Sequence, residues 1–294
     1  MTQTPQISQT GADDVRLMCL ATHHKGGTVW MKSIIQALSA AWNIPMIGIW
    51  SDRQLSKIPQ TGRAFLVNWH GTFPQDLWDR VDARFVHIIR DPRDVLISGC
   101  EYHHFAGPKG EGFLHSPRAD LGGLTYQQAI NHIEDVEGKL LFEMREKHAE
   151  TLREMMNRPY DHPHSVTVTY EDLMADHHGV TFRKAMAHWG LSAAEQDHAV
   201  RVFWDNSLFG GLAQDDARSD HVQTGTTQKW RDDLPYSVGQ VYAKEFGQDL
   251  IALGYEKNMD WVDGLAQSPS TASAAPSNMT AASGVRATDP AVHR

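Results

Sequence analysis

Residues 22–30 of this chain read Thr-His-His-Lys-Gly-Gly-Thr-Val-Trp. They follow an apolar run, Leu17 to Ala21, that is typical of a buried strand, and they precede residues 31–38, whose apolar positions recur about once per helical turn. Backbone N–H groups at a helix start are unpaired, glycine lets an anion approach them, and Lys25 adds a full positive charge. The stretch therefore predicts a site for a phosphate-like group. It does not contain the Gly-x-x-x-x-Gly-Lys-Ser/Thr pattern of a Walker A loop.

The composition excludes several classes of protein. The chain has 294 residues and a formal net charge of −9, which argues against a general nucleic-acid-binding protein because that function needs a basic surface. Cys19 and Cys100 lie in apolar segments without metal-ligand spacing, so we expect no zinc site and no disulfide framework. No apolar run approaches the roughly 18 residues of a membrane span, and residues 1–14 lack the pattern of a secretory signal. These features favour a cytoplasmic protein.

The chain divides into a flexible leader at residues 1–14, one domain at residues 15–263, and a tail at residues 264–294. The tail is rich in Ser, Ala, Thr and Pro and is predicted to be disordered. Within the domain, strands are predicted over 16–22, 63–69, 84–90 and 165–170. Helices are predicted over 28–42, 92–105, 126–156, 178–189, 193–206 and 237–253. This alternation predicts an α/β fold, with a mostly parallel sheet flanked by helices.

Long connections separate some of these elements. They cover residues 43–62, 106–123 and 207–234, and each is either a binding lid or a plain surface insertion.

A second informative segment covers residues 85–99. An apolar strand ends at Arg90, and Asp91 is placed to cap a helix whose first residue is Pro92. Ligands of open α/β sheets bind beyond the carboxyl ends of the strands, and the planar guanidinium of arginine suits a phosphate. Ser98 lies about two helical turns further on and offers a hydroxyl. A structural Arg–Asp pair followed by an ordinary helix serine is the alternative interpretation.

Together the two segments resemble the sulfotransferase family, enzymes that use 3′-phosphoadenosine 5′-phosphosulfate (PAPS). That family has a Pro-Lys-Ser-Gly-Thr-Thr-Trp loop, to which residues 24–30 are similar. It also has Arg-Asn/Asp-Pro-Arg/Lys-Asp followed by a serine, which residues 90–94 and Ser98 match. A third family element resembles residues 170–173, Tyr-Glu-Asp-Leu. The resemblance runs from residue 16 to about residue 257 and implies the P-loop-NTPase-like sulfotransferase fold.

The resemblance implies that eight residues contact the nucleotide: Lys25, Gly26, Gly27, Thr28, Trp30, Arg90, Ser98 and Tyr170. Residues 25–28 would hold the 5′-phosphosulfate, and Arg90 with Ser98 would hold the 3′-phosphate. Trp30 would stack on the adenine. For Trp30 the alternative is core packing, and for Tyr170 it is a strand-end tyrosine whose hydroxyl bonds to water.

The resemblance also implies a general base. His70 follows an apolar run, on the same side of the sheet as the loop that holds Lys25. The cytosolic branch of the family has Lys-Thr-His-Leu-Pro here, and its histidine is the base. This chain has Asn-Trp-His-Gly-Thr at 68–72, so the histidine is kept and the family's lysine is replaced by Asn68. His70 would take the acceptor's proton, and Lys25 would stabilise the leaving phosphate. A structural histidine at the end of the strand is the alternative.

Two further features bear on the site. The adjacent pairs His23–His24 and His103–His104 are poor chelates because neighbouring side chains diverge, and we expect no metal. Many family members close over the 3′-phosphate with Arg-Lys-Gly-x-x-Gly-Asp-Trp, whereas residues 223–230 read Gln-Thr-Gly-Thr-Thr-Gln-Lys-Trp. The candidates to replace the missing basic pair are Arg218, Lys229 and Arg231.

The leading hypothesis is a sulfotransferase that moves a sulfuryl group from PAPS to a hydroxyl or amine and releases adenosine 3′,5′-bisphosphate (PAP). A P-loop-like small-molecule kinase and a non-catalytic nucleotide-binding homologue are the alternatives. The kinase would need a carboxylate-held magnesium and a Walker-type lysine, and neither is evident in the sequence. The acceptor would be a small molecule, a glycan or a lipid, and the sequence does not indicate an oligomeric state.

Overall fold

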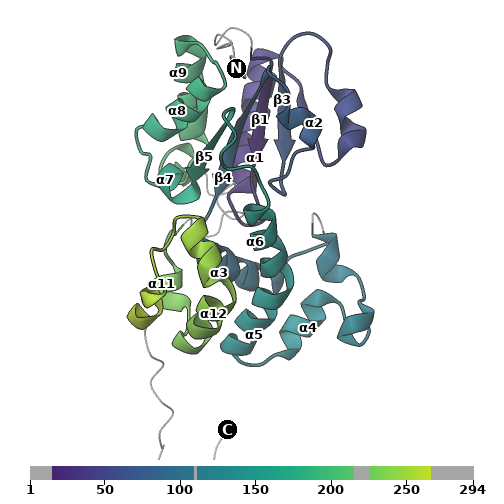
Figure 1. Ribbon diagram of the computed structural model, residues 1–294, viewed down its shortest axis with the longest axis vertical. Helices are drawn as coiled ribbons and strands as arrows, with labels where there is room; N and C mark the ends of the chain where they lie inside the picture. Colours follow the sequence, from purple (N-terminus) through teal and green to yellow (C-terminus); the bar gives the residue numbers. More distant parts are fainter. Residues whose placement is uncertain (1–14, 109–110, 215–225, 266–294) are drawn as a thin grey trace, which may run out of the picture.

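The computed structural model describes residues 15–108, 111–214 and 226–265. Its centre is a sheet of five parallel strands in the order β2-β3-β1-β4-β5 (Figure 1). The strands are β1 Leu17–Ala21, β2 Met46–Gly48, β3 Ala64–Asn68, β4 Ala83–Ile89 and β5 Ser165–Thr169. The prediction of an α/β fold with a parallel sheet is confirmed. The leader at 1–14 and the tail beyond Leu265 lie outside the described residues.

The helices cover most of the remaining chain. They are α1 Thr28–Trp42, α2 Gln75–Trp78, α3 Pro92–His103, α4 Tyr126–His132, α5 Val136–Glu143, α6 Ala149–Met156, α7 Tyr170–Met174, α8 Val180–His188, α9 Ala193–Asp205, α11 Trp230–Asp233 and α12 Tyr236–Ala252. Short 3₁₀ segments are η2 Asp52–Lys57, η3 Gly112–His115, η4 Ala119–Leu121, η6 Gly211–Gln214 and η7 Asp260–Gly264, and η5 Met144–His148 is a π-helix. Across the described ranges, no helix has the length and hydropathy needed to cross a bilayer.

Strand β1 lies at the centre of the sheet and is buried on both faces. All five of its residues are buried, and it pairs with β3 on one side and β4 on the other. Alternate side chains point to opposite faces. Met18 and Leu20 pack under α1, α8 and α9, while Leu17 and Cys19 belong to a second cluster with Leu77 of α2. A strand covered on both faces reads as a continuous apolar run, which is why β1 was recognisable.

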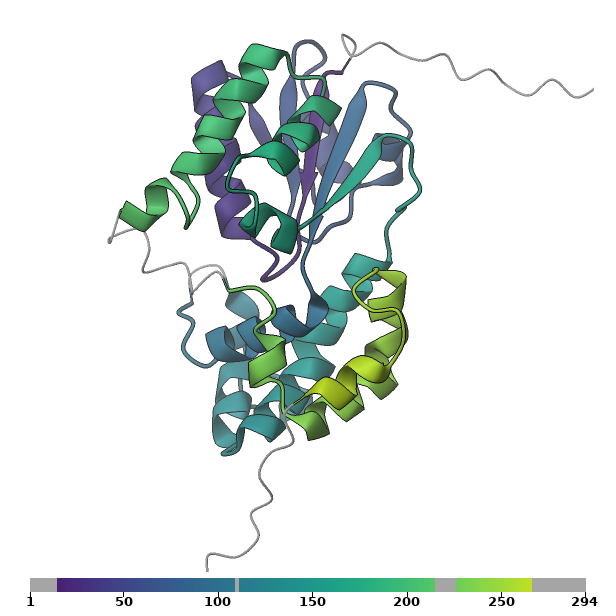
Figure 2. The same ribbon diagram turned by 90° about the vertical axis from the view of Figure 1, so that its left-hand side faces the viewer.

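The helices form two groups. Helices α1, α2, α7, α8 and α9 lie beside the sheet, whereas α3, α4, α5, α6, α11 and α12 gather beyond its carboxyl edge (Figures 1 and 2). The second group has its own apolar cluster, which includes Leu96 of α3, Leu140 of α5, Trp230 of α11 and Val238 of α12. The carboxyl edge of the sheet therefore lies between two packed bodies: the sheet with the helices beside it, and the second group of helices.

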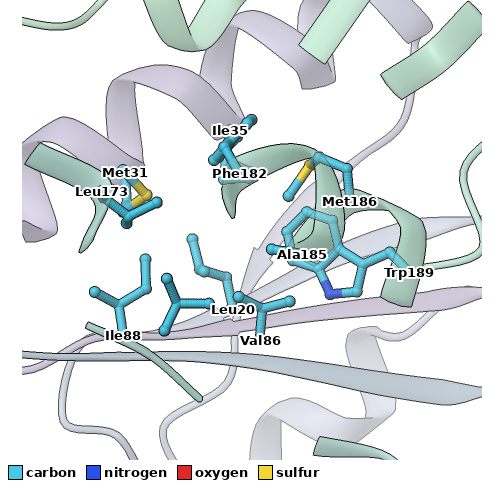
Figure 3. Close-up of a pocket in the computed structure, with 11 residues that line it drawn as sticks. Leu20, Met31, Ile35, Val86, Ile88, Leu173, Phe182, Ala185, Met186 and Trp189 are labelled. Atoms are coloured by element: carbon cyan, nitrogen blue, oxygen red, sulfur yellow. The ribbon is translucent and has the colours of Figure 1, made fainter. Parts of the chain in front are cut away.

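A small gap remains in the core between β1, β4 and the helices α1 and α8. Figure 3 shows Leu20 and Val86 of the sheet facing Ile35 of α1 and Met186 of α8. The cavity has a volume of about 10 Å³, and its lining is apolar. A space of that size holds at most about one water molecule, and without polar partners it stays empty. It is a packing defect of the core and not a ligand site.

The single helix predicted over 126–156 is wrong. Its start is confirmed, because Thr125 and Gln128 form the expected capping box. The helix then ends at His132, where Ile133 adopts extended backbone angles, and Asp135 caps a new helix by accepting a hydrogen bond from the N–H of Gly138. The π-helix η5 interrupts the pattern a second time before α6. The apolar periodicity continued across both breaks and concealed them.

Other boundaries agree with the sequence to within about three residues, and α1 matches its predicted bounds. Four short elements were not predicted: β2, α2, α7 and α11. Strand β2 is one of the two edge strands and has only three residues, so its pattern is too short to distinguish from a loop.

Candidate functional site

Four predicted site segments come directly after four neighbouring strands. The loop 22–27 follows β1, His70 follows β3, Arg90 follows β4, and Tyr170 follows β5. Because β3, β1, β4 and β5 are adjacent and parallel, their carboxyl ends meet at one edge of the sheet. The topology alone therefore brings together segments that lie up to about 150 residues apart in sequence.

The loop between β1 and α1 is tightly wound. Lys25 has φ 57° and Gly27 has φ 88°, both in the left-handed region. The N–H of Gly26 donates to the carbonyl of His23 at 2.9 Å, and the Thr28 hydroxyl donates to the same carbonyl at 3.0 Å. The Thr22 and Thr28 hydroxyls are 2.7 Å apart. These bonds hold the start of α1 in place with its first N–H groups at the sheet edge.

Gly27 has two reasons to be glycine. Its positive φ is strained for any L-residue with a side chain. A Cβ atom at this position would also lie 3.0 Å from Cδ2 of Tyr170. The backbone of the loop and the ring of Tyr170 thus approach each other more closely than a side chain at position 27 would allow.

Arg90 connects the other segments to this loop. Its Nη1 donates to the carbonyl of Lys25 at 3.0 Å, its Nη2 donates to the carbonyl of Thr226 at 3.2 Å, and its guanidinium lies 4.7 Å from the ring centroid of Tyr170. The side chain is only 10% exposed, and its Nε has no hydrogen-bond partner within the described part of the chain. A buried guanidinium with a donor still free is suited to an anion.

Lys25 adds a second positive charge beside Arg90. Burial, followed by the charge of Arg90, lowers the pKa of Lys25 to about 8. Its Nζ lies 4.0 Å from the ring centroid of Tyr102 on α3. The two positive charges repel each other, and among the residues described only Arg90 of the two forms an ion pair, with Asp94 Oδ2 3.8 Å from its Nη2. An anion bound here would relieve the repulsion, and the anion site expected from the sequence stays a prediction.

Trp30 and Ser98 lie at the margins of this cluster. The indole of Trp30 packs edge-on to Tyr170, with ring centroids 6.1 Å apart, and stacks on Phe203 at 5.2 Å. Its Nε1 is buried and has no partner among the residues described. Ser98 is half-buried on α3. Stacking of Trp30 on an adenine and contact of Ser98 with a 3′-phosphate stay predictions.

His70 lies in the turn after β3 and not within the strand. Asn68 shapes this turn, because its side chain donates to the carbonyls of Ile49 and Thr72, both at 2.6 Å, and accepts from the N–H of His70 at 2.8 Å. The residue that replaces the family's lysine is therefore a structural anchor for His70. The imidazole is 56% exposed.

Glu154 of α6 is the partner of His70 that sequence reasoning missed. His70 Nδ1 lies 3.2 Å from Glu154 Oε1, and this hydrogen bond raises the pKa of His70. Burial works against ionisation of Glu154, but its contacts with His23 and His70 outweigh that effect and lower its pKa to about 2. Glu154 Oε2 also lies 4.0 Å from His23 Nδ1, so it links the turn after β3 to the loop after β1.

The adjacent histidine pairs do diverge, as predicted, but each imidazole finds a partner elsewhere. His23 Nε2 lies 2.7 Å from His87 Nε2 of β4, and His24 Nε2 lies 3.0 Å from His103 Nε2 of α3. His103 in turn contacts Glu143 of α5. The sequence gives one signal for the contact between His24 and His103, namely the histidine directly before Lys25. That histidine was considered only as a possible metal ligand. Within the described ranges, no three His, Cys, Asp or Glu side chains form a metal-binding group.

A comparison with protein-family models decides the family. The model of the sulfotransferase domain matches residues 16–254. The chain belongs to the sulfotransferase family. A search of curated protein sequences found no match.

Solved structures that resemble this sulfotransferase include two of retinol dehydratase. One is in complex with androsterone and the inactive cofactor PAP (16% identity, TM-score 0.48, covering 80% of this chain and 81% of that one). Another is in complex with retinol and PAP (17% identity, TM-score 0.47, covering 80% and 82%). A third structure is mouse sulfotransferase SULT7A1 complexed with PAP (15% identity, TM-score 0.47, covering 85% and 87%).

The sulfotransferase departs from its family where the Arg-Lys pair is missing. Asp94 of α3 anchors this segment, because its carboxylate accepts from the N–H groups of Gln228 at 2.7 Å and Trp230 at 3.0 Å. Of the candidate replacements, Lys229 pairs with Glu101 and Asp233. The Arg231 guanidinium lies 4.4 Å from the ring of Trp230. Arg218 lies outside the described residues.

Proposed function

We propose that this protein transfers a sulfuryl group from PAPS to a hydroxyl or amine of an acceptor. The observation that carries the proposal is the contact between Arg90 and the Lys25 loop at the carboxyl edge of the sheet. It holds the guanidinium of Arg90 against the loop that carries Lys25, and the two positive charges are near enough to interact. A nucleotide with phosphate groups at both its 5′ and 3′ positions needs two such charges, whereas a single phosphate needs one.

The residues present fit PAPS. Residues 25–28 would hold the 5′-phosphosulfate, since they lead into the start of α1, where backbone N–H groups are unpaired, and Lys25 supplies charge. Arg90, with its free Nε, and Ser98 would hold the 3′-phosphate. Trp30 and Tyr170 would contact the nucleoside, and the closeness of their rings supports a shared role.

When bound, PAPS supplies a sulfuryl group whose sulfur–oxygen bond to the 5′-phosphate breaks as the acceptor forms a new bond to sulfur. His70 would accept the acceptor's proton. Its Nδ1 faces Glu154, which leaves Nε2 for the acceptor, and the carboxylate stabilises the imidazolium that forms. Lys25 would stabilise the charge that develops on the leaving phosphate, an effect worth a few kcal/mol in a closed site.

The acceptor would be a small molecule or a group on a glycan or lipid. Trp50 supports an acceptor with an apolar or ring-shaped face, because it is 46% exposed and its ring lies 6.1 Å from that of His70. A cytoplasmic location stays a proposal, and it agrees with the two free, buried thiols of Cys19 and Cys100.

A PAPS-dependent screen of acceptors, read by the mass gain of one sulfuryl group, tests the activity.

His70→Ala tests the mechanism. We expect this variant to lose at least about 100-fold in turnover, the usual contribution of a general base, and to keep its PAP affinity. His132→Ala, an exposed histidine on α4, is the matched control. Wild-type turnover in His70→Ala would show that another group takes the proton, and PAP binding without transfer to any acceptor would indicate a non-catalytic homologue.

A further inference from the structure

A chain of buried polar groups runs from α5 to the loop that holds Lys25. Glu143 Oε2 accepts from the hydroxyl of Tyr126 at 2.6 Å and lies 2.7 Å from His103 Nδ1. His103 Nε2 lies 3.0 Å from His24 Nε2. His103, Glu143 and Tyr126 are each at most 1% exposed. Four polar side chains are thus aligned in the interior, and the proposed function uses none of them.

The fold makes room for this chain. Gly99 lies within α3, and a Cβ atom there would be 2.7 Å from Glu143 Oε1. Glycine inside a helix costs about 0.5–1 kcal/mol relative to alanine. Gly99 lowers the stability of α3 at the position where the carboxylate of Glu143 needs space. The placement of this carboxylate therefore matters.

The hydrogen bonds determine where the protons lie. A carboxylate is only an acceptor, so His103 Nδ1 carries a proton toward Glu143. In the neutral form, His103 Nε2 is then an acceptor, and the 3.0 Å contact requires His24 Nε2 to carry the proton. The remaining nitrogen of His24, Nδ1, is left without a proton. Glu143 therefore prepares His24 Nδ1 as a proton acceptor, acting through His103.

Several charged groups surround His24 Nδ1. Glu111, just before η3, has its Oε1 3.8 Å from it. Burial lowers the pKa of His24 well below its usual value, and the charges of His103, Lys25, Lys147 and His70 act in the same direction. The ring is therefore neutral in the free protein, and its bare Nδ1 can take a proton. His24 and His70 are near enough for their charges to interact, and each is supported by a carboxylate: Glu143 through His103, and Glu154 directly.

Counting protons links this arrangement to a class of acceptor. A hydroxyl gives up one proton when it is sulfated. An amine that arrives as an ammonium group gives up two, the first to become a nucleophile and the second after the nitrogen–sulfur bond has formed. One carboxylate-supported imidazole is enough for a hydroxyl, whereas two match an amine.

We propose that His24, supported by His103 and Glu143, is a second proton acceptor beside His70, and that the acceptor is a primary amine. One proton of the ammonium group moves to one of the two imidazoles. After the nitrogen attacks sulfur, the second proton moves to the other. A proton taken by His24 Nδ1 releases the Nε2 proton to His103, whose imidazolium stays paired with the carboxylate of Glu143. This inference rests on the proposed sulfuryl transfer.

Matched acceptors test the inference. The wild-type protein with PAPS is assayed on 2-phenylethylamine and 2-phenylethanol, and on further amine–alcohol pairs with aliphatic and sugar skeletons. We expect the amine of at least one pair to have a kcat/KM at least about tenfold above that of its alcohol. A preference for the alcohol in every active pair would overturn the inference and leave the proposed function standing. Failure of both members of all pairs, with PAP still bound, would count against the proposed function and also against the amine.

Variants separate a relay from a merely structural network. Glu143→Gln and His24→Asn should each lower kcat for the preferred amine about 10- to 100-fold and leave the PAP dissociation constant unchanged. The double variant should be no worse than His24→Asn alone, because Glu143 acts through His24. Additive losses would mean that Glu143 only supports the fold, and the relay would be rejected. His132→Ala controls for the loss of an unrelated imidazole.

A readout without turnover completes the test. In the PAP-bound protein, ¹⁵N NMR of the imidazoles should show His24 protonated at Nε2 and bare at Nδ1. Addition of 2-phenylethylamine should shift the Nδ1 signal, and 2-phenylethanol should shift it less. A proton on His24 Nδ1 in the free and ligated states would overturn the relay even if sulfuryl transfer is established.

Discussion

Lys25 combines two opposing demands. It must be charged to bind an anion, yet burial and the charge of Arg90 lower its pKa to about 8. An arriving phosphate removes the conflict because it supplies the missing negative charge. The residue is thus poised to respond to its ligand, and its response should be visible in the pH dependence of binding.

We expect the affinity for PAP to fall above pH 8. The free protein loses the Lys25 proton as pH rises through its pKa, while the complex retains it, so the association constant should drop by up to about tenfold per pH unit. Titration calorimetry between pH 7 and pH 9.5 measures this. Lys25→Arg should bind PAP with little pH dependence, since arginine stays protonated throughout. A flat profile for the wild-type protein would show that Lys25 does not contact the ligand.

Glu154 should control the pH range in which His70 works. The hydrogen bond from Glu154 raises the pKa of His70, so the imidazole stays protonated to a higher pH and becomes a base only above it. Glu154→Gln removes this effect. The rising acid limb of the kcat/KM profile should therefore move to lower pH, and the same shift should appear in an NMR titration of the His70 ring.

Glu134→Gln, a change to an exposed glutamate, is the control for the loss of one surface charge. If Glu154→Gln leaves the acid limb where it is, the limb belongs to another group. His70 would then have to be reconsidered as the base.

At the scale of elements, the turn from β1 into α1 depends on one glycine. Gly27 both adopts a left-handed conformation and lies against the ring of Tyr170. Its contact with Tyr170 brings the loop after β1 against the start of α7, the helix that follows β5. Gly27 is also the N-cap of α1, whose buried apolar residues pack against the sheet: Met31, Ile34, Ile35 and Leu38.

Gly27→Ala should therefore destabilise the protein and weaken PAP binding. The backbone conformation costs about 1–2 kcal/mol for a residue with a Cβ atom, and displacement of Tyr170 adds to it. Gly254→Ala is the matched control, since Gly254 has φ 82° but open space where its Cβ would lie. Denaturant unfolding should show a larger loss for Gly27→Ala than for Gly254→Ala. Equal losses, with equal PAP affinity, would mean that the contact with Tyr170 has no consequence.

Residues 226–230 are held in place although the family's motif is missing there. The family's Arg-Lys pair is absent, but Arg90 and Asp94 hold residues 226–230 through backbone contacts at Thr226, Gln228 and Trp230. A carboxylate at the start of α3 thus fixes a segment more than 130 residues further along the chain. The segment stays at the carboxyl edge without the basic side chains that other family members use there.

At the scale of the whole molecule, the ligand should join the two packed bodies. The residues proposed to bind PAP come from the sheet edge and from α3, so occupancy links the apolar clusters on either side. At a PAP concentration of about 100 times its dissociation constant, the folded state gains about 2.7 kcal/mol. For a domain of this size that corresponds to a rise in Tm of about 5–10 °C.

We expect thermal unfolding to show this rise with PAP and not with ATP and magnesium. The comparison separates the sulfotransferase proposal from the kinase alternative, because only PAP carries a 3′-phosphate for Arg90. Arg90→Ala should reduce the rise with PAP. Stabilisation by ATP and magnesium alone would favour a kinase.

Local patterns in the sequence were sufficient for four of the five strands, for α1, and for the positions of the Lys25 loop and Arg90 at the ends of their strands. The buried run at 17–21, the glycines after Lys25, and the Arg-Asp-Pro sequence at 90–92 each act through neighbours a few residues away. Parallel order then follows from the alternation of strands and helices, and it places Lys25 and Arg90 together. These features depend on short-range sterics, burial and capping, which a single sequence displays directly.

The contacts of the histidines are different, because their partners lie on separate elements. Glu154 reaches His70 across 84 residues, and His24 reaches His103 across 79. The two breaks in the 126–156 region orient α5 and α6, so they also decide which way Glu143 and Glu154 point. Adjacent histidines could be seen in the sequence, but the identity of their partners depends on how distant helices pack, and no local pattern encodes that.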